Sequence, residues 1–563
     1  MIEILAFCLV ISFSIIISGS FFLNYFSINN LLSKSLYSNP FEKGLFGIIF
    51  ISYLALLINF VYPLNKTINT LILFLFLFYS FFLKYNKKFF IYLIILSVVA
   101  SILIIYNNVN RPDAGSYHLP YVNILNENKL IIGLSNIHFR FAHISIIQYL
   151  SSIFNNFIFK DNGTSLPTAI ITALFLGYLI NELYLLRKKN KINLIYYFFL
   201  FLILIVSFYN LSNYSEYGND IPGYIYFFFC VILFFKIKDI KSISKEDFGK
   251  ILAVSIFVGM NKIFLLLIFI IPIYLLIVSK KITLLKSKIV YFSLSIFILW
   301  FLKSFFVSGC LVYPIKITCS QNIYWTDIAE IKKESISGEA WAKGWIDQKN
   351  IVIDQEQYIQ KFNWIKTWSS KHLLKIFDKI IPILLLIIVF IISVFRFRKK
   401  KNLNIYWCPN SIYKTKIIFF ISFLGLIIWF LKFPLYRYGH SYLHGFLIFG
   451  SLLLIKNINI KNISFNIRLN EIFLFICFIL FISKNLQRIY NNYNEDYLYS
   501  PWPKIYSFSK NNEKINPQPI FQSGKIIYYK SNEICMYGYS PCTHTNANLE
   551  MDEIYGYKIF VKK

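Results

Sequence analysis

The sequence predicts an all-α polytopic membrane protein with about 12 to 14 transmembrane helices, interfacial helices and a small extracytoplasmic C-terminal domain. Hydrophobic residues make up 57% of the 563 residues and charged residues only 15%, whereas soluble proteins carry about a quarter charged residues. Apolar runs recur along the whole chain, and each is near the ~20 residues that a helix needs to cross a bilayer. Basic residues, which give a formal net charge of +30, gather in the short segments between these runs.

Each apolar run is interpreted as one membrane span, with a single exception. Residues 251–278 have basic runs on both sides, so one crossing does not fit the charges. Two short helices that enter the membrane and return to the same side, with a turn near residues 259–262, would keep both basic runs on that side. The first run lacks a basic leader and a cleavage site, so we expect a retained helix. The predicted spans are 2–22, 44–62, 69–85, 89–106, 165–186, 193–210, 222–236, 288–306, 377–397, 415–432, 440–455 and 470–484.

The distribution of basic residues predicts the orientation of these spans. Basic loops remain on the cytoplasmic side, which assigns to that side residues 34–43, 84–88, 187–191, 236–250, 280–288, 396–402 and 456–468. Alternation then places residues 107–164, 211–221, 307–376, 432–439 and 485–563 outside. Nucleic acid is not an expected partner, because no basic domain with interleaved aromatic residues is present.

Three regions follow from this pattern: N-terminal membrane helices at 1–88, a transmembrane core at 89–484, and a C-terminal domain at 485–563. Within the core, the weakly apolar stretch 122–158 predicts one or two helices lying in the outer interface. The external loop 307–376 contains several Trp residues, which either anchor the loop at headgroup level or contact a sugar. The C-terminal domain is expected to be mixed α/β or strand-rich.

The segment from Arg111 to Pro120 places a guanidinium, a carboxylate and an imidazole at the mouth of a predicted span. Ionisable groups are costly at a bilayer boundary, so such a cluster is a candidate functional site. Asp113 either caps a helix after Pro112 or acts as a general base or metal ligand. His118 either binds a phosphate when protonated or donates a hydrogen bond to a carbonyl group.

Further cations lie in other predicted outer segments. His138 and Arg140 fall in the interfacial stretch, where an arginine either reaches toward headgroups or binds a phosphate with two parallel hydrogen bonds. Arg437 lies between two spans and is expected to meet a phosphate or to reach toward headgroups, with His440 as a helper. Lys262, at the tip of the predicted helical hairpin, is a further candidate cation.

Two carboxylates, Glu216 and Asp220, occupy the short outer loop 211–221. They are either solvated loop acids or groups that face the same external cavity as Asp113. Together with Asp113 they could hold a sugar hydroxyl or a divalent cation, Mg²⁺ or Mn²⁺, although no cofactor is certain from these residues.

Cysteine positions agree with the predicted orientation. Cys310 and Cys319 bracket part of one outer loop, and Cys535 and Cys542 bracket a short turn in the C-terminal segment. Disulfides form in oxidising compartments, so both pairs are disulfide candidates. Their spacing also permits a metal site, but no partner set of His and Cys completes one.

The common motifs for nucleotide binding, for serine hydrolases and for zinc proteases are missing from the sequence. There is no phosphate-binding loop, no Gly-rich dinucleotide motif, no Gly-x-Ser-x-Gly turn and no His-Glu-x-x-His helix. A nucleotide donor handled inside the cell is therefore not expected, and a lipid-linked donor used outside is favoured.

The order of these features resembles the C-type glycosyltransferase superfamily (GT-C), multi-spanning enzymes that use polyprenyl-phosphate-linked sugars. In that superfamily an Asp in the first large external loop follows a membrane helix, interfacial helices come next, and a second acidic loop follows. Asp113, the stretch 122–158, and Glu216 with Asp220 match this order.

The chain also resembles a family of bacterial multi-spanning proteins over roughly residues 90–450. The residues that carry this likeness are Asp113 to His118, Gly133 to Arg140, Ser308 to Pro314 and Pro434 to Gly439. Two features depart from the superfamily pattern: spans precede the one that leads to Asp113, and a single Asp replaces an Asp-x-Asp pair, so the pattern does not specify a metal.

The resemblance implies a glycosyltransferase in the bacterial cytoplasmic (inner) membrane, with its active site and C-terminal domain facing the periplasm or exterior. Its partners would be a lipid-linked sugar donor, an acceptor glycan, lipid or protein, and membrane lipids. Asp113 would activate the acceptor or order a metal, Glu216 and Asp220 would position sugar or cation, and the donor phosphate would contact Arg437, Arg140, His118 and Lys262. Alternatives are a glycan polymerase or ligase, a transporter or flippase, and a non-catalytic envelope scaffold. The oligomeric state does not follow from the sequence.

Overall fold

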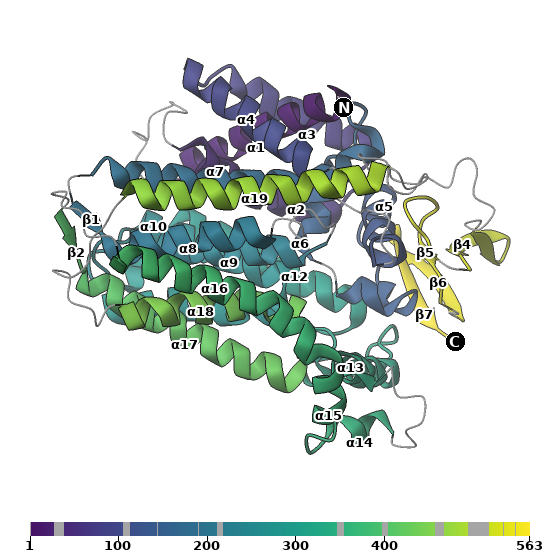
Figure 1. Cartoon of the computed structure of the whole chain (residues 1–563). Coiled ribbons are helices and arrows are strands. Elements are labelled where there is room, and N and C mark those ends of the chain that lie inside the picture. The colour runs from purple at the N-terminus through teal and green to yellow at the C-terminus, as the bar shows by residue number, and fades with distance from the viewer. Residues whose placement is uncertain are drawn as a thin grey trace.

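The protein is mostly helical, and its strands lie at the two ends of a helical bundle in a computed structural model of the chain (Figure 1). In the described part, seven helical segments are long and apolar enough to cross a membrane. They are α1 (Ile2–Phe26), α2 (Pro40–Asn59), α4 (Lys87–Ile104), the continuous segment Lys160–Arg187, α12 (Lys288–Ser308), α17 (Pro409–Lys432) and α18 (Tyr436–Ile455). The structure describes residues 2–26, 39–104, 113–143, 145–189, 191–210, 218–345, 354–396, 404–455, 467–493, 517–532, 534–545 and 548–563.

Shorter or less apolar helices complete the bundle. The segment Lys160–Arg187 consists of a 3₁₀ turn followed by α7 (Leu166–Arg187). The other helices of the bundle are α3 (Lys66–Ser80), α8 (Leu194–Asn210), α9 (Asp220–Lys236), α10 (Lys245–Asn261), α11 (Ile270–Ser279), α16 (Leu374–Arg396) and α19 (Ile467–Tyr493). Each predicted apolar run corresponds to a helix, because in an apolar setting the backbone groups must be paired within the segment.

Local sequence sets several helix ends. Asn39 precedes Pro40, and its side chain accepts a hydrogen bond from the backbone N–H of Glu42 at the start of α2. Ser244 caps α10 in the same way through the N–H of Asp247. Such side-chain acceptors satisfy N–H groups that have no partner within the helix.

The predicted break in residues 251–278 is confirmed. Helix α10 ends at Asn261, Lys262 has an extended backbone, and a 3₁₀ segment, η5 (Ile263–Phe269), leads into α11. Lys262 therefore lies at the turn between two helical segments.

The stretch 113–158 consists of short helical pieces rather than one long helix. They are η1 (Ala114–His118), α5 (Leu119–Glu127), η2 (Leu134–Asn136), η3 (Phe139–Ala142) and α6 (Ile146–Ile153). The short helices predicted here are present, and much of their surface is buried against the rest of the chain. Tyr121 of α5 and Tyr149 of α6 are buried, with their hydroxyl oxygens 3.2 Å apart.

The loop region after α12 contains the Cys310–Cys319 disulfide, then α13 (Ile328–Ala342), α14 (Gln355–Ile359) and α15 (Ile365–Trp368). Trp364 and Trp368 are buried, and both rings lie 5.3 Å from the Phe430 ring of α17. These two Trp residues therefore pack in a core, whereas the sequence suggested headgroup or sugar contacts for the whole group.

Strands occur at opposite ends of the bundle (Figure 1). At one end, β1 (Lys191–Asn193) pairs in parallel with β2 (Asn404–Tyr406). At the other end, β3 (Gln518–Gln522), β4 (Lys525–Lys530) and β5 (Cys542–Thr543) form one sheet, and β6 (Leu549–Ile554) and β7 (Tyr557–Lys562) form a hairpin. We call the end with β3–β7 the rim end. Helix α19 continues to Tyr493, past the predicted boundary at residue 484.

Candidate functional site

Charged side chains from separate segments meet at the rim end of the bundle. The Arg437 guanidinium in α18 lies 3.1 Å from Oδ2 of Asp113, which precedes η1. The Lys262 ammonium, after α10, lies 2.6 Å from Oδ1 of Asp220, the first residue of α9. Lys262 also donates a hydrogen bond of 3.0 Å to the backbone carbonyl of Arg437. We call Asp113, Asp220, Lys262, Arg437 and His440 the rim cluster.

Asp113 occupies a helix-capping position, but its side chain makes no capping hydrogen bond. Its carboxylate is directed to Arg437 instead, and the two side chains are 53% and 41% exposed. An ion pair this exposed adds no more than about 1 kcal/mol to stability. The pair therefore contributes mainly by placing an accessible carboxylate beside an accessible guanidinium.

The second ion pair of the cluster is more enclosed. The Lys262 side chain is 8% exposed and Asp220 is 31% exposed. Burial lowers the pKa of Lys262, and the neighbouring carboxylate of Asp220 opposes this shift. The ring of Tyr438 also lies 4.9 Å from the ammonium. Because a buried charge needs a partner, this pair holds the starts of α9 and η5 together beneath Arg437.

Aromatic rings frame the Arg437 guanidinium. Its central carbon lies 5.5 Å from the Trp341 ring and 5.1 Å from the Tyr438 ring, and Nη2 donates a 3.3 Å hydrogen bond to the Tyr438 hydroxyl. Cation–π contacts favour a fixed position of the planar group. The guanidinium is thus oriented while it remains partly open to solvent.

Arg140 is a further cation close to the cluster. Its guanidinium lies 5.7 Å from the Tyr117 ring and 4.9 Å from the Phe139 ring. Within the described part of the chain, Arg140 forms no ion pair with a carboxylate. The Tyr117 hydroxyl lies within electrostatic range of Arg140, Asp113 and Arg437. Arg140 therefore shares an electrostatic environment with the Asp113–Arg437 pair.

His118 is a neutral group in this environment. The backbone N–H of Ser145 donates to Oε1 of Gln148, which leaves the Gln148 amide N–H to donate to His118 Nδ1 at 2.6 Å. The ring proton is therefore on Nε2, the nitrogen nearest to Gly218. Burial lowers the pKa of His118 to about 4, so at neutral pH the ring carries no positive charge with which to bind a phosphate.

His440 extends the cluster inward along α18. Its Nδ1–H donates a 2.8 Å hydrogen bond to the Arg437 carbonyl, and its ring stacks on Tyr224 at 4.9 Å. Nε2 is buried and has no hydrogen-bond partner among the described residues. One turn further, His444 contacts the hydroxyls of Tyr224 and Tyr436 at 3.1 Å and 3.0 Å. His444 was missed from the sequence, although its spacing of four residues from His440 places both on one helix face.

Two other predicted site residues have different outcomes. His138 accepts a hydrogen bond from the Arg140 backbone N–H at 3.1 Å and lies 4.9 Å from the His544 ring. Burial lowers its pKa to about 3, so His138 acts as a neutral helix cap. Glu216 lies outside the described residues.

The predicted cation site can be followed for only two of its three carboxylates, because Glu216 lies outside the described residues. Of its three carboxylates, Asp113 and Asp220 each pair with a separate cation, and the described residues contain no group of three His, Cys, Asp or Glu side chains that could hold a metal. The predicted cysteine pairs are different: the structure contains both the Cys310–Cys319 and the Cys535–Cys542 disulfides.

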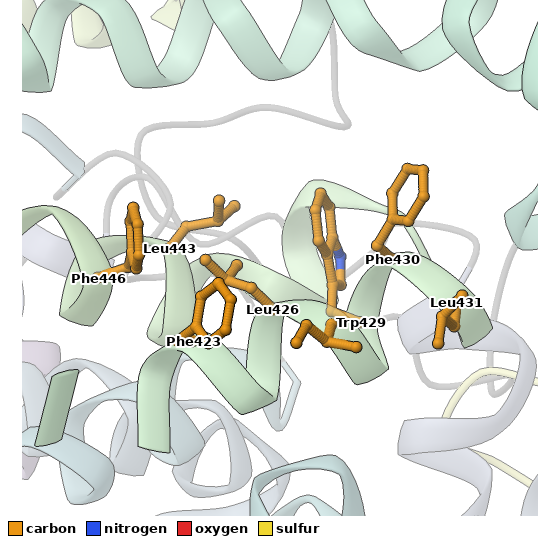
Figure 2. Close-up of a pocket in the computed structure, with 8 residues that line it drawn as sticks. Phe423, Leu426, Trp429, Phe430, Leu431, Leu443 and Phe446 are labelled. Carbon is orange, nitrogen blue, oxygen red and sulfur yellow. The ribbon is translucent and has the colours of Figure 1, made fainter. Parts of the chain in front are cut away.

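An apolar groove of about 380 Å³ is lined by side chains of α17 and α18 (Figure 2). Trp429 is the residue that links it to the rim cluster, because its indole N–H donates to the Leu435 carbonyl and its ring packs against Gly439. The groove is lined by residues that include Phe423, Leu426, Trp429, Phe430, Leu443 and Phe446.

Comparison with known families gives one match, a model described as a domain of unknown function (DUF8201), over residues 1–444. The matched region contains every member of the rim cluster and ends before the C-terminal strands. No curated protein and no solved structure matches the chain.

Proposed function

The chain belongs to the family described as a domain of unknown function (DUF8201), and from the rim cluster we propose that it is a membrane glycosyltransferase. It transfers a sugar from a polyprenyl-phosphate-linked donor to an acceptor outside the bacterial inner membrane. The observation that carries this proposal is the Asp113–Arg437 pair, an accessible acid and an accessible cation held together at the ends of apolar helices. Such groups at a bilayer boundary favour work on a substrate with both an anionic and an apolar part.

The cations of the site suit the donor phosphate. Arg140 has no carboxylate partner among the described residues, and Arg437 shares its charge with a half-exposed carboxylate. Guanidinium groups bind phosphate oxygens through two parallel hydrogen bonds. The donor phosphate binds between Arg140 and Arg437 in this proposal, while Lys262 remains paired with Asp220 and supports Arg437 through its carbonyl.

The apolar groove on α17 and α18 accounts for the lipid part of the donor. Its lining combines α17 with Leu443 and Phe446 of α18, the helix that carries Arg437, and it includes Trp429, whose ring packs against Gly439 beside His440. A polyprenyl chain is apolar along its length, so it can pack against the apolar side chains that line this groove. A water-soluble nucleotide sugar would leave the groove unused.

The proposed reaction exchanges one bond to the sugar for another. Donor phosphate draws Arg437 away from Asp113, and the released carboxylate accepts the proton of the acceptor hydroxyl. The acceptor oxygen forms a bond to the anomeric carbon as the bond from that carbon to the phosphate oxygen breaks. The polyprenyl phosphate leaves with the bonding electrons, and Arg140 and Arg437 stabilise its charge.

The test is transfer of sugar from polyprenyl-phosphate donors by the purified full chain and its variants. We expect Asp113→Asn and Arg437→Ala to lower the rate by about 100-fold or more, the range typical for loss of a general base or a charge-stabilising group. Arg187→Ala is the matched control, because Arg187 forms a similarly exposed pair with Glu471 away from the rim cluster. Wild-type rates in both rim variants would contradict the proposal.

A further inference from the structure

A second cleft lies apart from the rim cluster, between the loop that follows Cys319, the turn at residues 133–136, and strand β7. Its volume is about 610 Å³, within the range of about 300–1,000 Å³ that small-molecule sites occupy. Its lining includes Asn136, Gln321, Tyr324, Trp325, Asp327 and Lys562.

The walls of this cleft are joined by direct hydrogen bonds. The Asn136 side-chain amide donates to the carbonyls of Trp325 and Phe560, both at 2.9 Å. At Gly133 the backbone has a φ of +67°, and a Cβ there would lie 2.1 Å from the Phe560 carbonyl oxygen. Only glycine permits this close approach of the segments. The cleft is therefore formed in advance of any ligand.

The side chains in the cleft combine aromatic faces with amide and carboxylate groups. Tyr324 is 55% exposed, and its ring meets Trp325 edge-on at 5.2 Å. Among the described residues, Trp325 Nε1 and Thr326 Oγ1 are buried atoms without a hydrogen-bond partner. The protein itself encloses these two atoms, so the groups that a ligand can reach in the cleft are the exposed amide of Gln321 and the exposed ring of Tyr324.

Three lysines, Lys316, Lys562 and Lys563, line the cleft, and two of them pair with acids. Lys562 pairs with Asp327 at 2.9 Å and with Glu330 at 3.1 Å, and Lys563 pairs with Glu550 at 3.0 Å. A phosphate-rich ligand would need these cations for itself. Aromatic rings with amide donors and carboxylate acceptors suit instead a neutral ligand with apolar ring faces and a rim of hydroxyls.

We propose that this cleft binds a neutral oligosaccharide, with Tyr324 under a sugar ring and with the Gln321 amide, the Asn136 side-chain oxygen and Asp327 at its hydroxyls. Asn136 and Arg140 are four residues apart, so their Cα atoms are separated by at most about 14 Å. A saccharide held here extends toward the donor site. That it is the acceptor glycan rests on the proposed function; that the cleft binds a saccharide does not.

The experiment measures binding of defined neutral hexasaccharides to the detergent-purified full chain by titration calorimetry, with maltohexaose, cellohexaose, chitohexaose and mannohexaose as probes. We expect at least one to bind the wild-type protein and Tyr324→Ala to weaken that binding about tenfold, since a few aromatic anchors supply most of the binding free energy of such sites. Gln321→Ala, which removes an exposed amide, should weaken it as well. Tyr555→Ala is the control, because Tyr555 is an exposed tyrosine at the β6–β7 turn and does not line the cleft.

Asp113→Asn separates this proposal from the proposed function. It should bind the hexasaccharide as tightly as the wild-type protein does, whatever its effect on transfer. Lack of binding by every hexasaccharide would overturn the inference, and so would wild-type affinity in both Tyr324→Ala and Gln321→Ala.

Discussion

The two ion pairs of the rim cluster differ in burial, and this difference determines what each contributes. Asp113 and Arg437 are about half exposed, whereas the Lys262 ammonium is nearly enclosed. An exposed pair adds little to stability, but removal of one partner from an enclosed pair leaves a charge without compensation. The first pair is therefore suited to exchange partners with a substrate, and the second to hold the helices in place.

The first prediction follows from this contrast. Arg437→Ala should change the free energy of unfolding by less than about 1 kcal/mol, although we expect it to lower the proposed transfer by about 100-fold. Lys262→Met should lower it by about 1–3 kcal/mol, less than for a fully buried pair because Asp220 keeps some exposure. Thermal unfolding of the purified variants in detergent measures both. If the variants have equal stability, the supporting role of Lys262 is wrong; the double variant Lys262→Met with Asp220→Asn should recover part of the loss.

The second prediction concerns His118 and pH. Burial lowers its pKa from 6.5 to about 4 in the folded chain, so the unfolded chain binds the proton first as the pH falls. Stability from the neutral ring is therefore complete above about pH 6.5 and is lost as the pH falls toward 4, by at most about 3 kcal/mol. His118→Asn should lose less stability than the wild-type protein between pH 7 and pH 4.5. If the free energies of unfolding of the two proteins fall equally over this pH interval, His118 is not buried as a neutral ring.

At the residue scale, the sequence predicted the charged members of the rim cluster because each lies beside the end of an apolar run. It left open whether Asp113 caps a helix or acts as a base or metal ligand, and it did not predict the pair with Arg437, since the partner lies 324 residues away. It also missed the contacts of Trp341 and Tyr438 with Arg437. Aromatic contacts of this kind depend on tertiary packing and leave no local pattern.

At the scale of elements, close helix packing depends on small side chains at the crossing of α1 and α2. A Cβ on Gly47 would lie 1.8 Å from the Ile15 carbonyl oxygen, so no larger side chain fits without backbone movement. Helices in apolar surroundings associate mainly through such close packing.

The third prediction tests this crossing. Gly47→Ala should lower the free energy of unfolding by about 1–3 kcal/mol, because the added methyl group forces the two backbones apart. Gly338→Ala in α13 is the matched control: a Cβ there meets nothing within 4 Å, so this change should be neutral or stabilise the helix by up to about 1 kcal/mol. Thermal unfolding measures both, and equal effects in the two variants would show that the crossing tolerates separation.

Helix positions were well predicted, and helix ends less so, for a physical reason. Hydropathy marks where an apolar run stops, but a helix continues while its polar residues keep helical hydrogen bonds. Helix α19 illustrates this, because it runs through a polar segment to Tyr493. The way in which the five strands from β3 through β7 pair with one another was not predictable in detail, since strand partners are set by contacts distant in sequence.

At the scale of the whole molecule, the C-terminal strands are attached to the segment that carries Asp113. The Met536 N–H donates to the Gly115 carbonyl at 2.7 Å, and Ile132 exchanges hydrogen bonds with Lys558 and Phe560 at 2.9 Å and 3.0 Å. Tyr557 donates to the Phe60 carbonyl at 2.7 Å. The sequence predicted a small C-terminal domain at 485–563, and these bonds join its described strands to the rim end. This attachment could not be predicted, because the paired segments are more than 400 residues apart.

The last prediction concerns this attachment. Deletion of residues 517–563 removes the acceptor of the Ile132 N–H and the donor to Gly115, so amides of residues 114–143 should exchange with deuterium at least about tenfold faster. The rate of sugar transfer should fall as well, because Asp113 is positioned by the same segment. The Leu64 N–H, which donates to the Leu125 carbonyl, reports whether α5 itself stays folded, and amides of α9 serve as the control for the bundle. Unchanged exchange over residues 114–143 would mean that the bundle alone orders this segment. Faster exchange with undiminished transfer would separate the strands from the chemistry, since the carboxylate of Asp113 would then reach Arg437 without them.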